Sequence, residues 1–376
     1  MSKECVNGCV RQECNPTFRI PAEWEEQSAV WITWPCMPGW WANAREESLE
    51  SFARLAAVIS RYETVKINCP AKSPKACRGY SGPEDAKRRI EKALGNLSNI
   101  EFYDIPTNDV WCRDSGTIFA LQRNSKLCAL DFKYNSWGGK FPPWDLDDAL
   151  ASKMALAAGA EIINCRKMVC EGGALEFDGK GWLLTTECVV LNSNRNPGFT
   201  KAQAEEYLMQ SCGIDRVIWL KDGLCGDDTD GHIDNLARFT PCGKILAASC
   251  DQSNASYANL QRNLDILKNA ACESGKRYEI VELPVPKEPV IAKGYDGKDR
   301  ILPASYANYL VVNNAVIMPS YSQMSDKFAE EILRSSFPGR EIVAIDCRIF
   351  LMEGGAVHCL TQQEPAQINK LENFKE

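Results

Sequence analysis

Apolar runs of strand length alternate with amphipathic stretches of helical length along the chain. Residues 42–62 predict a helix, because apolar side chains recur there at intervals of three and four residues along one face. A second helix is predicted to begin at Pro83, a favourable first-turn residue, and to end before Gly95, which suits a left-handed C-cap. A third is predicted to begin at Thr200, where Gln203 completes a capping box.

Short runs of buried type predict strands between these helices. The predicted strands cover residues 64–68, 216–220, 244–249 and 277–283, and two later helices cover 257–272 and 326–335. This alternation predicts an α/β fold. Because no Pro-, Gly- or Ser-rich tract of linker length interrupts it, we expect a single domain. Its bounds are 18–366, with an N-terminal leader at 1–17, whose order is left open, and a C-terminal tail at 367–376.

A faint internal repetition accompanies the alternation. The segment VCEGGALEF at residues 169–177 is similar to LMEGGAVHC at 351–359, since in both an apolar run meets an acidic residue and two glycines and then resumes. Segments 30–35, 110–121 and 230–239 share a looser pattern of strand, polar kink and strand. The unequal spacings exclude a solenoid. We interpret these segments as related modules whose kinks converge on one centre, each providing one or two functional side chains.

Composition and charge restrict the class of protein. The chain of 376 residues has 45% hydrophobic and 25% charged residues, as ordinary globular proteins do. Its formal net charge of -7, without a long basic run, disfavours a nucleic-acid partner and suits a small cationic substrate. No run approaches the roughly eighteen apolar residues of a membrane span, so we expect no membrane association.

The cysteines indicate a reducing compartment. All 18 are spread over a core-forming sequence without an apolar leader, so we expect a cytoplasmic location and thiols that mostly pack in the core. Cys5, Cys9 and Cys14 cluster in the polar leader, where a metal clip, a redox pair and no specific role are all open. No fourth ligand there has the spacing that zinc sites favour, so no metal site is predicted.

One thiol has an unusual neighbourhood. In MEGGAVHCLTQQ, Cys359 follows His358, one of only two histidines in the chain. The preceding pair of glycines, Gly354 and Gly355, allows close approach of another group. A nucleophilic cysteine needs an electropositive or cationic neighbour that favours its thiolate, so Cys359 is a candidate for attack on a cationic carbon.

The second histidine lies beside a carboxylate. His232 and Asp234 alternate along DGHIDNLARF, which we expect to be extended, so that both side chains share one face. A histidine there can carry protons, and the carboxylate can bind a positive group or orient the ring. A buried, hydrogen-bonded histidine without catalytic function is the alternative.

Three carboxylates, those of Asp114, Glu171 and Asp234, occupy strand breaks that contain Gly or Ser. Buried unpaired charges are unfavourable, so a cationic ligand would neutralise the group. Trp111, close to Asp114 in NDVWCRDSG, can provide a flat apolar wall for an alkyl chain or a cation. A solvated turn with an Arg113 ion pair is the alternative for that segment.

Eight segments together carry a resemblance to a known family. They are FRIPAEWEEQSAVWITWP, NDVWCRDSG, FKYNSWGG, EGGALEFDGKG, TECVVLNSNRNP, GDDTDGHIDNLARF, LPASYANYL and EGGAVHCLTQQ. The chain resembles the agmatine deiminases, or agmatine iminohydrolases, which belong with bacterial peptidylarginine deiminase to the guanidine-modifying pentein superfamily. The resemblance extends from about Phe18 to Pro365.

The resemblance implies a five-bladed α/β propeller of ββαβ-type modules around a pseudo-fivefold axis. It also implies a hydrolase of linear amidines that converts agmatine and water into N-carbamoylputrescine and ammonia, without metal or cofactor. The family nucleophile, which forms a covalent amidino intermediate, falls on Cys359, and the acid/base histidine falls on His232. The aspartates that bind the guanidinium fall on Asp114 and Asp234.

Further residues match the substrate pocket of the family. They are Glu171, Trp111, Gly355 and Trp34, the last in a candidate lid that also contains Glu23 and Trp24. The chain departs from the family in one place, since Glu353-Gly-Gly-Ala356 replaces three glycines and an asparagine before His-Cys, and this departure affects the local pocket.

Several alternatives stay open. The same residues suit a peptidyl-arginine or free-arginine deiminase, or an amidinotransferase that delivers the carbon to an amine. A cysteine-rich binding or redox protein is the alternative outside enzymes. For agmatine, which ends in an amine, we expect a pocket closed by apolar or acidic groups and without an arginine. Relatives are often oligomers, so a homo-oligomer is also open, although no motif identifies an interface.

Overall fold

The computed structural model describes residues 18–38, 41, 44–73, 79–270, 275, 277–293 and 298–367. The predicted leader, with Cys5, Cys9 and Cys14, lies outside the described residues, as does the tail beyond residue 367. The described part is a mixed α/β fold, as the alternation of elements predicted.

Five of the six sheets in the described ranges repeat one arrangement. In each, one strand pairs antiparallel with one neighbour and parallel with another, and a helix connects the two parallel strands. This helix is needed because parallel strands cannot be joined by a tight turn. We call the five repeats units 1 to 5.

The elements of each unit follow in chain order. Unit 1 contains β2 (Gln27–Thr33), α1 (Arg45–Ile59), β3 (Thr64–Asn68), α2 (Pro83–Leu94) and β4 (Ile100–Tyr103), with β19 (Thr361–Pro365) from the other end of the sequence. Unit 2 contains β1 (Phe18–Arg19), α3 (Cys112–Ser115), β5 (Ile118–Gln122), β6 (Leu127–Lys133), α4 (Ser136–Gly139), α5 (Leu150–Ala157) and β7 (Glu161–Val169). Unit 3 contains the 3-10 turn η1 (Gly172–Ala174), β8 (Glu176–Phe177), β9 (Trp182–Thr186), α6 (Glu187–Val190), α7 (Lys201–Cys212) and β10 (Arg216–Leu220).

Unit 4 contains the 3-10 turn η2 (Ile233–Asn235), β11 (Ala237–Phe239), β12 (Lys244–Ser249), α8 (Tyr257–Asn269) and β13 (Glu279–Pro284). A hairpin of β14 (Ile291–Lys293) and β15 (Asp299–Ile301) precedes unit 5. Unit 5 contains β16 (Leu310–Val312), β17 (Ala315–Ser320), α9 (Ser325–Ser336) and β18 (Glu341–Asp346), and α10 (Arg348–Leu351) follows it.

Local sequence signals place the helix ends where they were predicted. Helix α2 begins at Pro83 and ends before Gly95, whose φ of 89° is left-handed. At the start of α7, Thr200 and Gln203 form the predicted capping box. Helix α1 begins at Arg45, later than predicted, and residues 42 and 43 of the predicted helix lie outside the described ranges.

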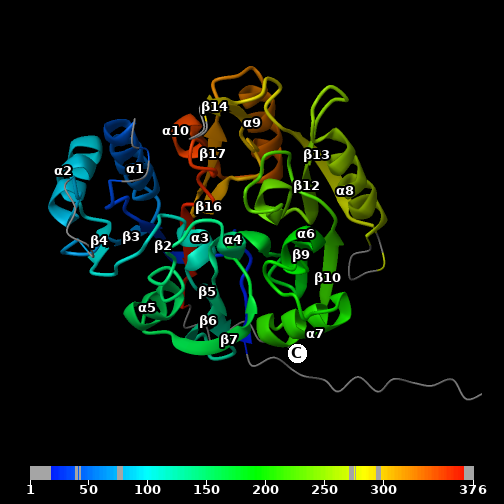
Figure 1. Ribbon diagram of the computed structural model, residues 1–376, viewed down its shortest axis with the longest axis horizontal. Coiled ribbons are helices and arrows are strands. Elements are labelled where there is room, and N and C mark those ends of the chain that lie inside the picture. Colours follow the sequence, from blue (N-terminus) through cyan, green and yellow to red (C-terminus); the bar gives the residue numbers. More distant parts are fainter. Residues whose placement is uncertain are drawn as a thin grey trace, which may run out of the picture.

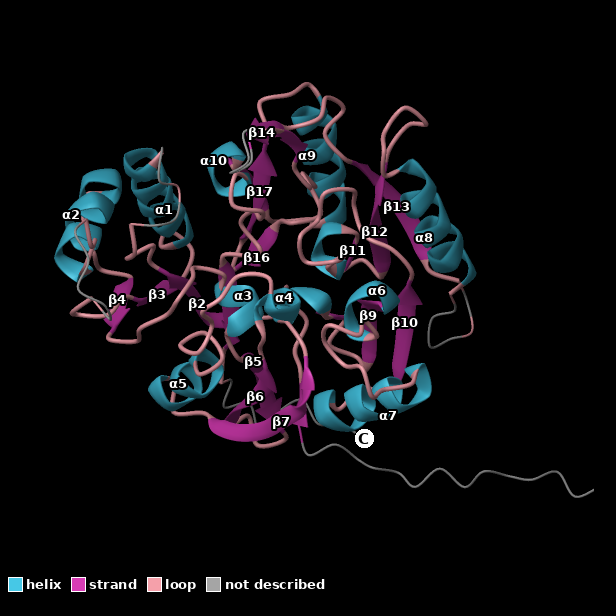
Figure 2. Ribbon diagram, in the orientation of Figure 1, coloured by secondary structure: helices cyan, strands magenta, loops and turns pink. Residues whose placement is uncertain are grey.

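The longer helices α1, α2, α7, α8 and α9 lie towards the rim of the molecule and the sheets lie nearer its middle (Figure 1). In unit 1, the buried side chain of Phe52 in α1 packs edge-on against Phe350, with ring centroids 5.1 Å apart. Burial of such a side chain contributes roughly 1.5–3 kcal/mol to folding. Short helices, among them α3, α4 and α6, and connecting loops lie near the middle, among the sheets (Figure 2).

The segments that precede β5, β8, β11, β16 and β19 contact one another in a closed ring. The ring is made by Arg113 N–H to Cys359 O (3.2 Å), Gly173 N–H to Asp114 (3.0 Å), the approach of Gly173 to His232, Asn308 to Asn235 (3.0 Å) and His358 N–H to Asn308 (3.1 Å). Each unit thus brings one segment to a common centre.

Four of the predicted kinks, in segments 110–121, 169–177, 230–239 and 351–359, lie in this ring. The prediction for segment 30–35 is wrong, because most of it continues β2 as an inner strand of unit 1. The fifth segment of the ring comes instead from the loop before β16, which contains Asn308. Within the described ranges, no helix combines the length and apolar character that crossing a bilayer requires.

Candidate active site

The Cys359 sulfur lies at the centre of the ring, just before β19, and 3% of the residue is exposed. It accepts a hydrogen bond from Asn308 Nδ2 at 3.1 Å and lies 3.7 Å from Asp234 Oδ2. Burial and the negative charges of Asp234 and Asp114 raise the pKa of this thiol well above its ordinary value. A positive charge beside the sulfur is therefore needed before the thiolate becomes abundant.

Asp234 binds the other histidine, not the one beside it in the sequence. Its Oδ2 lies 2.8 Å from His358 Nδ1, and His358 Nε2 lies 2.9 Å from Glu23 Oε2. An imidazole that meets a carboxylate at each nitrogen can donate to both only as the imidazolium. Burial acts to raise the pKa of Asp234, but the hydrogen bond and charge of His358 hold it below its ordinary value. Asp234 Oδ1 has no hydrogen-bond partner among the described residues.

This arrangement corrects two expectations. The segment with His232 and Asp234 is not extended but forms the 3-10 turn η2, so the two side chains need not share a face by alternation. Glu23, which was expected in a lid, is buried. Its Oε2 accepts a hydrogen bond from Arg238 Nη2 at 2.6 Å and also contacts His358 Nε2. A buried carboxylate that contacts both Arg238 and His358 is a fixed part of the site, so Glu23 does not behave as part of a lid.

His232 is fully buried among carboxylates. Its Nδ1 lies 3.6 Å from Asp114 Oδ1, and its Nε2 lies 3.8 Å from Glu171 Oε2. Both separations are too long for hydrogen bonds, and neither ring nitrogen has another partner within the described part. Burial alone would lower the pKa of His232, but Asp114 and Glu171 raise it to about 9. The ring therefore carries a proton at neutral pH.

Asp114 is held by two N–H donors. Its Oδ1 accepts from the Gly173 backbone at 3.0 Å, and its Oδ2 accepts from the Trp137 indole at 2.9 Å. Burial and neighbouring carboxylates raise the pKa of Asp114 to about 6, although the His232 charge opposes this. The two donors fix the plane of the carboxylate at the centre of the ring.

Glu171 is ionised and directed by a buried arginine. Arg195 Nε donates to its Oε1 at 2.7 Å, and both side chains are fully buried. Burial acts to raise the pKa of Glu171, but Arg195 and His232 lower it to about 2. Its Oε2 has no hydrogen-bond partner in the described part of the chain and faces His232.

Gly173 marks the point where three of these groups meet. A Cβ atom on Gly173 would lie 2.6 Å from His232 Nδ1, 2.7 Å from Asp114 Oδ1 and 3.2 Å from Asp234 Oδ2. Any side chain would displace them, so the glycine is required by their close approach. The structure thus brings together Cys359, His232, Asp114, Asp234 and Glu171, the predicted residues with ionisable side chains.

Trp111 and Gly355 also lie at this centre. A Cβ on Gly355 would lie 2.4 Å from the Trp111 ring and 3.0 Å from Cys359 Cβ, so the glycine lets the indole lie beside the nucleophile. Glu353 accepts the Trp41 backbone N–H at 2.9 Å, and Ala356 is buried close to Cys359. The departure from the family pattern therefore connects this loop to residue 41.

Trp34 is placed differently from the other predicted residues. Its indole N–H donates to Ser81 at 2.9 Å, and its ring packs edge-on against Phe52. It also lines a small cavity with Asp109 and Val110, two residues that precede Trp111 in the sequence. A contact of Trp34 with substrate stays a prediction.

Sequence reasoning did not single out Asn308, Trp137 or Arg195, which contact Cys359, Asp114 and Glu171 respectively. All three lie in segments that carry the family resemblance, LPASYANYL, FKYNSWGG and TECVVLNSNRNP. Their side chains do not resemble nucleophiles or acid/base groups, so only membership of these segments could have indicated them.

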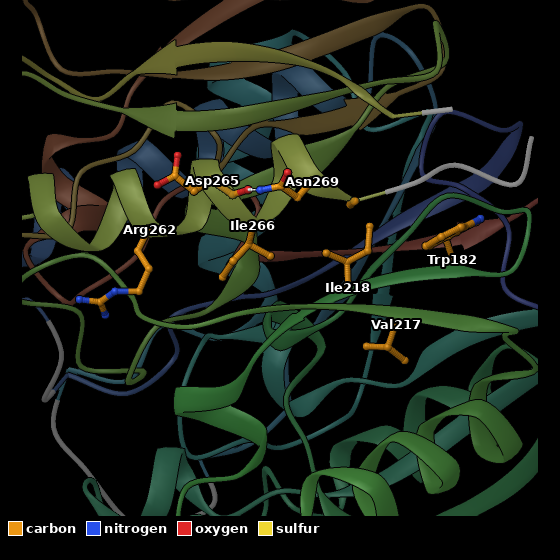
Figure 3. Close-up of a pocket in the computed structure, with 8 residues that line it drawn as sticks. Trp182, Val217, Ile218, Arg262, Asp265, Ile266 and Asn269 are labelled. Atoms are coloured by element: carbon orange, nitrogen blue, oxygen red, sulfur yellow. Dashed lines mark hydrogen bonds between the residues drawn. The ribbon is translucent and has the colours of Figure 1, made fainter. Parts of the chain in front are cut away.

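Two surface hollows lie outside the cluster. One of about 620 Å³ lies between α8 and the strands β9 and β10, where Ile266 lies opposite Ile218 (Figure 3). Another of about 710 Å³ lies at the start of α9 and includes the exposed Met324 and Phe328. Neither has a member of the cluster in its lining. Among the described residues, no three His, Cys, Asp or Glu side chains are grouped as metal ligands.

Known proteins are similar to this chain over nearly its whole length. The family model of the Porphyromonas-type peptidyl-arginine deiminases matches residues 19–365. The agmatine deiminase of Pseudomonas putida is 34% identical over 94% of this chain and 97% of its own length. The agmatine deiminase of Pseudomonas syringae pv. tomato is 34% identical over 93% of this chain and 96% of its own.

Solved structures of agmatine deiminases also match this chain over nearly its whole length. The agmatine deiminase of Enterococcus faecalis matches with a TM-score of 0.85 at 29% identity, and covers 94% of this chain and 97% of its own. A substrate-bound cysteine-to-serine variant of C. jejuni agmatine deiminase matches with a TM-score of 0.79 at 32% identity, and covers 93% and 96%.

Proposed function

Because this chain belongs to the family of Porphyromonas-type peptidyl-arginine deiminases and agmatine deiminases, we propose that it hydrolyses the guanidinium group of agmatine to N-carbamoylputrescine and ammonia. The observation that carries the proposal is the convergence of one thiol, one imidazole and three buried carboxylates on Gly173 and its surroundings. Asp234 Oδ1, Glu171 Oε2 and both His232 nitrogens have no hydrogen-bond partner among the described residues, as expected of groups that await a ligand.

A guanidinium ion fits these groups by charge and shape. Its planar N–H groups can donate to the carboxylates of Asp114 and Asp234, which would hold its plane against the Cys359 sulfur. The cation also offsets the negative charges that keep the thiol protonated, so substrate binding itself favours the thiolate. The Trp111 ring, packed on Gly355 beside the sulfur, is positioned to contact the alkyl chain.

The first half of the reaction forms a covalent intermediate. The thiolate attacks the central carbon and yields a neutral tetrahedral adduct. His232, protonated at neutral pH, gives its proton to one nitrogen, which leaves as ammonia. A positively charged amidino thioether remains on Cys359, and His232 is now neutral.

The second half returns the enzyme to its starting state. Neutral His232 takes a proton from water as its oxygen attacks the same carbon. The adduct then expels the Cys359 thiolate, and loss of a proton from oxygen gives the urea product. Glu171, held ionised by Arg195, stabilises the imidazolium form of His232 in both halves. The reaction involves no oxidation or reduction and no phosphoryl transfer, so it requires no cofactor.

Further expectations belong to the same proposal. The five units and their ring of contacts support a five-bladed α/β propeller that forms a single domain over residues 18–366. We expect the protein to act in the cytoplasm on a small cationic substrate, and its assembly into a homo-oligomer is tested by size-exclusion chromatography with light scattering.

Substrate specificity is tested with three guanidino compounds. Ammonia release from agmatine, free arginine and a blocked arginine peptide is measured with the full chain. We expect kcat/KM for agmatine to exceed the values for the other two compounds by at least about 100-fold. The far end of agmatine is an amine, and a pocket suited to that amine would leave its own polar groups unpaired when the substrate carries a carboxylate or a peptide there. Comparable values with the peptide would support the peptidyl-arginine deiminase reading, and an amine acceptor that captures the carbon would support amidino transfer.

The nucleophile is tested by Cys359→Ser, which should abolish turnover and leave the melting temperature unchanged. Cys225→Ser, at an exposed cysteine, is the matched control and should retain activity. Intact mass after a rapid acid quench with agmatine should show the amidino adduct on the wild type and on Cys225→Ser, and not on Cys359→Ser. Residual turnover above about one per cent in Cys359→Ser would mean that another group attacks.

A further inference from the structure

Asn308 occupies the fifth place in the ring, directly before β16, as Asp114 precedes β5 and Cys359 precedes β19. It is 1% exposed and its side chain touches the Cys359 sulfur. The other members of the ring provide carboxylates, an imidazole and the thiol. Asn308 contributes a neutral amide.

The orientation of this amide is fixed by its neighbours. Its Oδ1 accepts the backbone N–H groups of His358 at 3.1 Å and Cys359 at 3.4 Å. Its Nδ2 donates to Asn235 Oδ1 at 3.0 Å and to the Cys359 sulfur at 3.1 Å. A carboxamide has two N–H donors and two acceptor lone pairs, so all four positions are used. If the amide oxygen and nitrogen were exchanged, the side-chain NH2 would face the backbone N–H groups of His358 and Cys359, which are also donors. The nitrogen therefore faces the sulfur, and the sulfur meets a donor.

The charged groups that face the sulfur oppose its ionisation. Asp234 and Asp114 are both acidic, and the nearby Tyr321 hydroxyl is hydrogen-bonded to Ser305 O. A cationic side chain in place of Asn308 would stabilise a thiolate but would repel the guanidinium. A neutral N–H donor stabilises the thiolate and leaves the cation's place free.

We propose that Asn308 is a further catalytic residue, whose side-chain N–H stabilises the Cys359 thiolate when the substrate guanidinium binds. The S–H bond is the only bond broken in this step, and its proton passes to water. The inference rests on the proposed function in one respect, namely that Cys359 is the nucleophile.

The test is Asn308→Asp, which keeps the shape but replaces the donor by an acceptor with negative charge. The rate of Cys359 alkylation by iodoacetamide is measured against pH without substrate. The tryptic peptide 349–370 contains Cys359 as its only cysteine, so mass spectrometry isolates this thiol from the other 17 of the 18. We expect the midpoint of the profile to rise by about one to two pH units, since hydrogen bonds to charged groups are of that strength. The kcat for agmatine should fall by a similar factor of about 10 to 100, with a smaller change in KM.

Ser305→Ala is the control for loop disruption, because Ser305 anchors the same loop through Asn235 O without a described contact to the sulfur. It should lower the melting temperature and leave the alkylation midpoint in place. If Asn308→Asp alkylates with the wild-type midpoint, or if Ser305→Ala shifts the midpoint equally, Asn308 is only structural. Alkylation of Cys359 does not require turnover. If the wild-type protein is alkylated at Cys359 but releases no ammonia from agmatine, the proposed function is refuted, whereas the effect of Asn308 on the thiol can still be measured.

Discussion

Substitution of Gly173 by alanine tests whether the convergence at this residue sets the catalytic geometry. Gly173 lies in η1 without a positive φ, so its backbone accepts alanine. The added methyl group would lie 2.6 Å from His232 Nδ1 and 2.7 Å from Asp114 Oδ1, whereas ordinary contacts begin at 3.4 Å. These atoms must therefore retreat by about 0.7–0.8 Å.

The expected loss follows from that displacement. A misplacement on the order of 1 Å can lower a rate by about 100-fold, so we expect kcat/KM for agmatine to fall by about that factor. Overpacking costs roughly 1–3 kcal/mol of stability, part of which is offset because alanine restricts the unfolded chain. The folded state should therefore persist, with a melting temperature only a few degrees lower.

Ammonia release and thermal melting are measured together on Gly173→Ala and on Gly198→Ala. The control residue also lies in unit 3, and apart from Gly198 and its two chain neighbours no heavy atom of the described chain lies within 4 Å of its added Cβ. Gly198→Ala should match the wild type. If Gly173→Ala retains more than about a third of wild-type kcat/KM, the three groups are not held by their contact around Gly173, and the reasoning on the site is wrong.

Two further outcomes concern the ionisable groups. The profile of kcat/KM for agmatine should rise as pH rises through about 6, where Asp114 loses its proton and gains the charge that binds the guanidinium, and should fall above about 9, where His232 loses the proton it donates. A flat profile from pH 5 to 7 would contradict the assignment of Asp114. His232→Asn should lower kcat by at least about 100-fold with little change in KM, because proton transfer acts in the transition state, and an equal effect on binding would contradict that role.

Much of the local structure could be predicted from the sequence. Pro83, Gly95 and Thr200 mark helix ends through their own backbone and side-chain preferences, and the structure confirms each of them. His232 and Cys359 could also be singled out, since the chain has only two histidines and Cys359 directly follows the other one.

The partners of these residues could not be predicted in the same way. His232 and Asp234 are neighbours in the sequence, but Asp234 binds His358, 124 residues away. His358 in turn binds Glu23, 335 residues away, and Asn308 reaches Cys359 across 51 residues. Segment 30–35 has the pattern of a kink, but residues 30–33 belong to the inner strand β2, because β19 and β3 pair with both of its edges.

The sequence by itself therefore determined the elements and the chemical groups, because backbone preferences act over a few residues and rare side chains can be counted. Only the tertiary structure decided which carboxylate orients which histidine and which neutral amide meets the sulfur. These contacts depend on closure of the ring, in which β19 at the end of the described chain completes the sheet of unit 1 at its beginning.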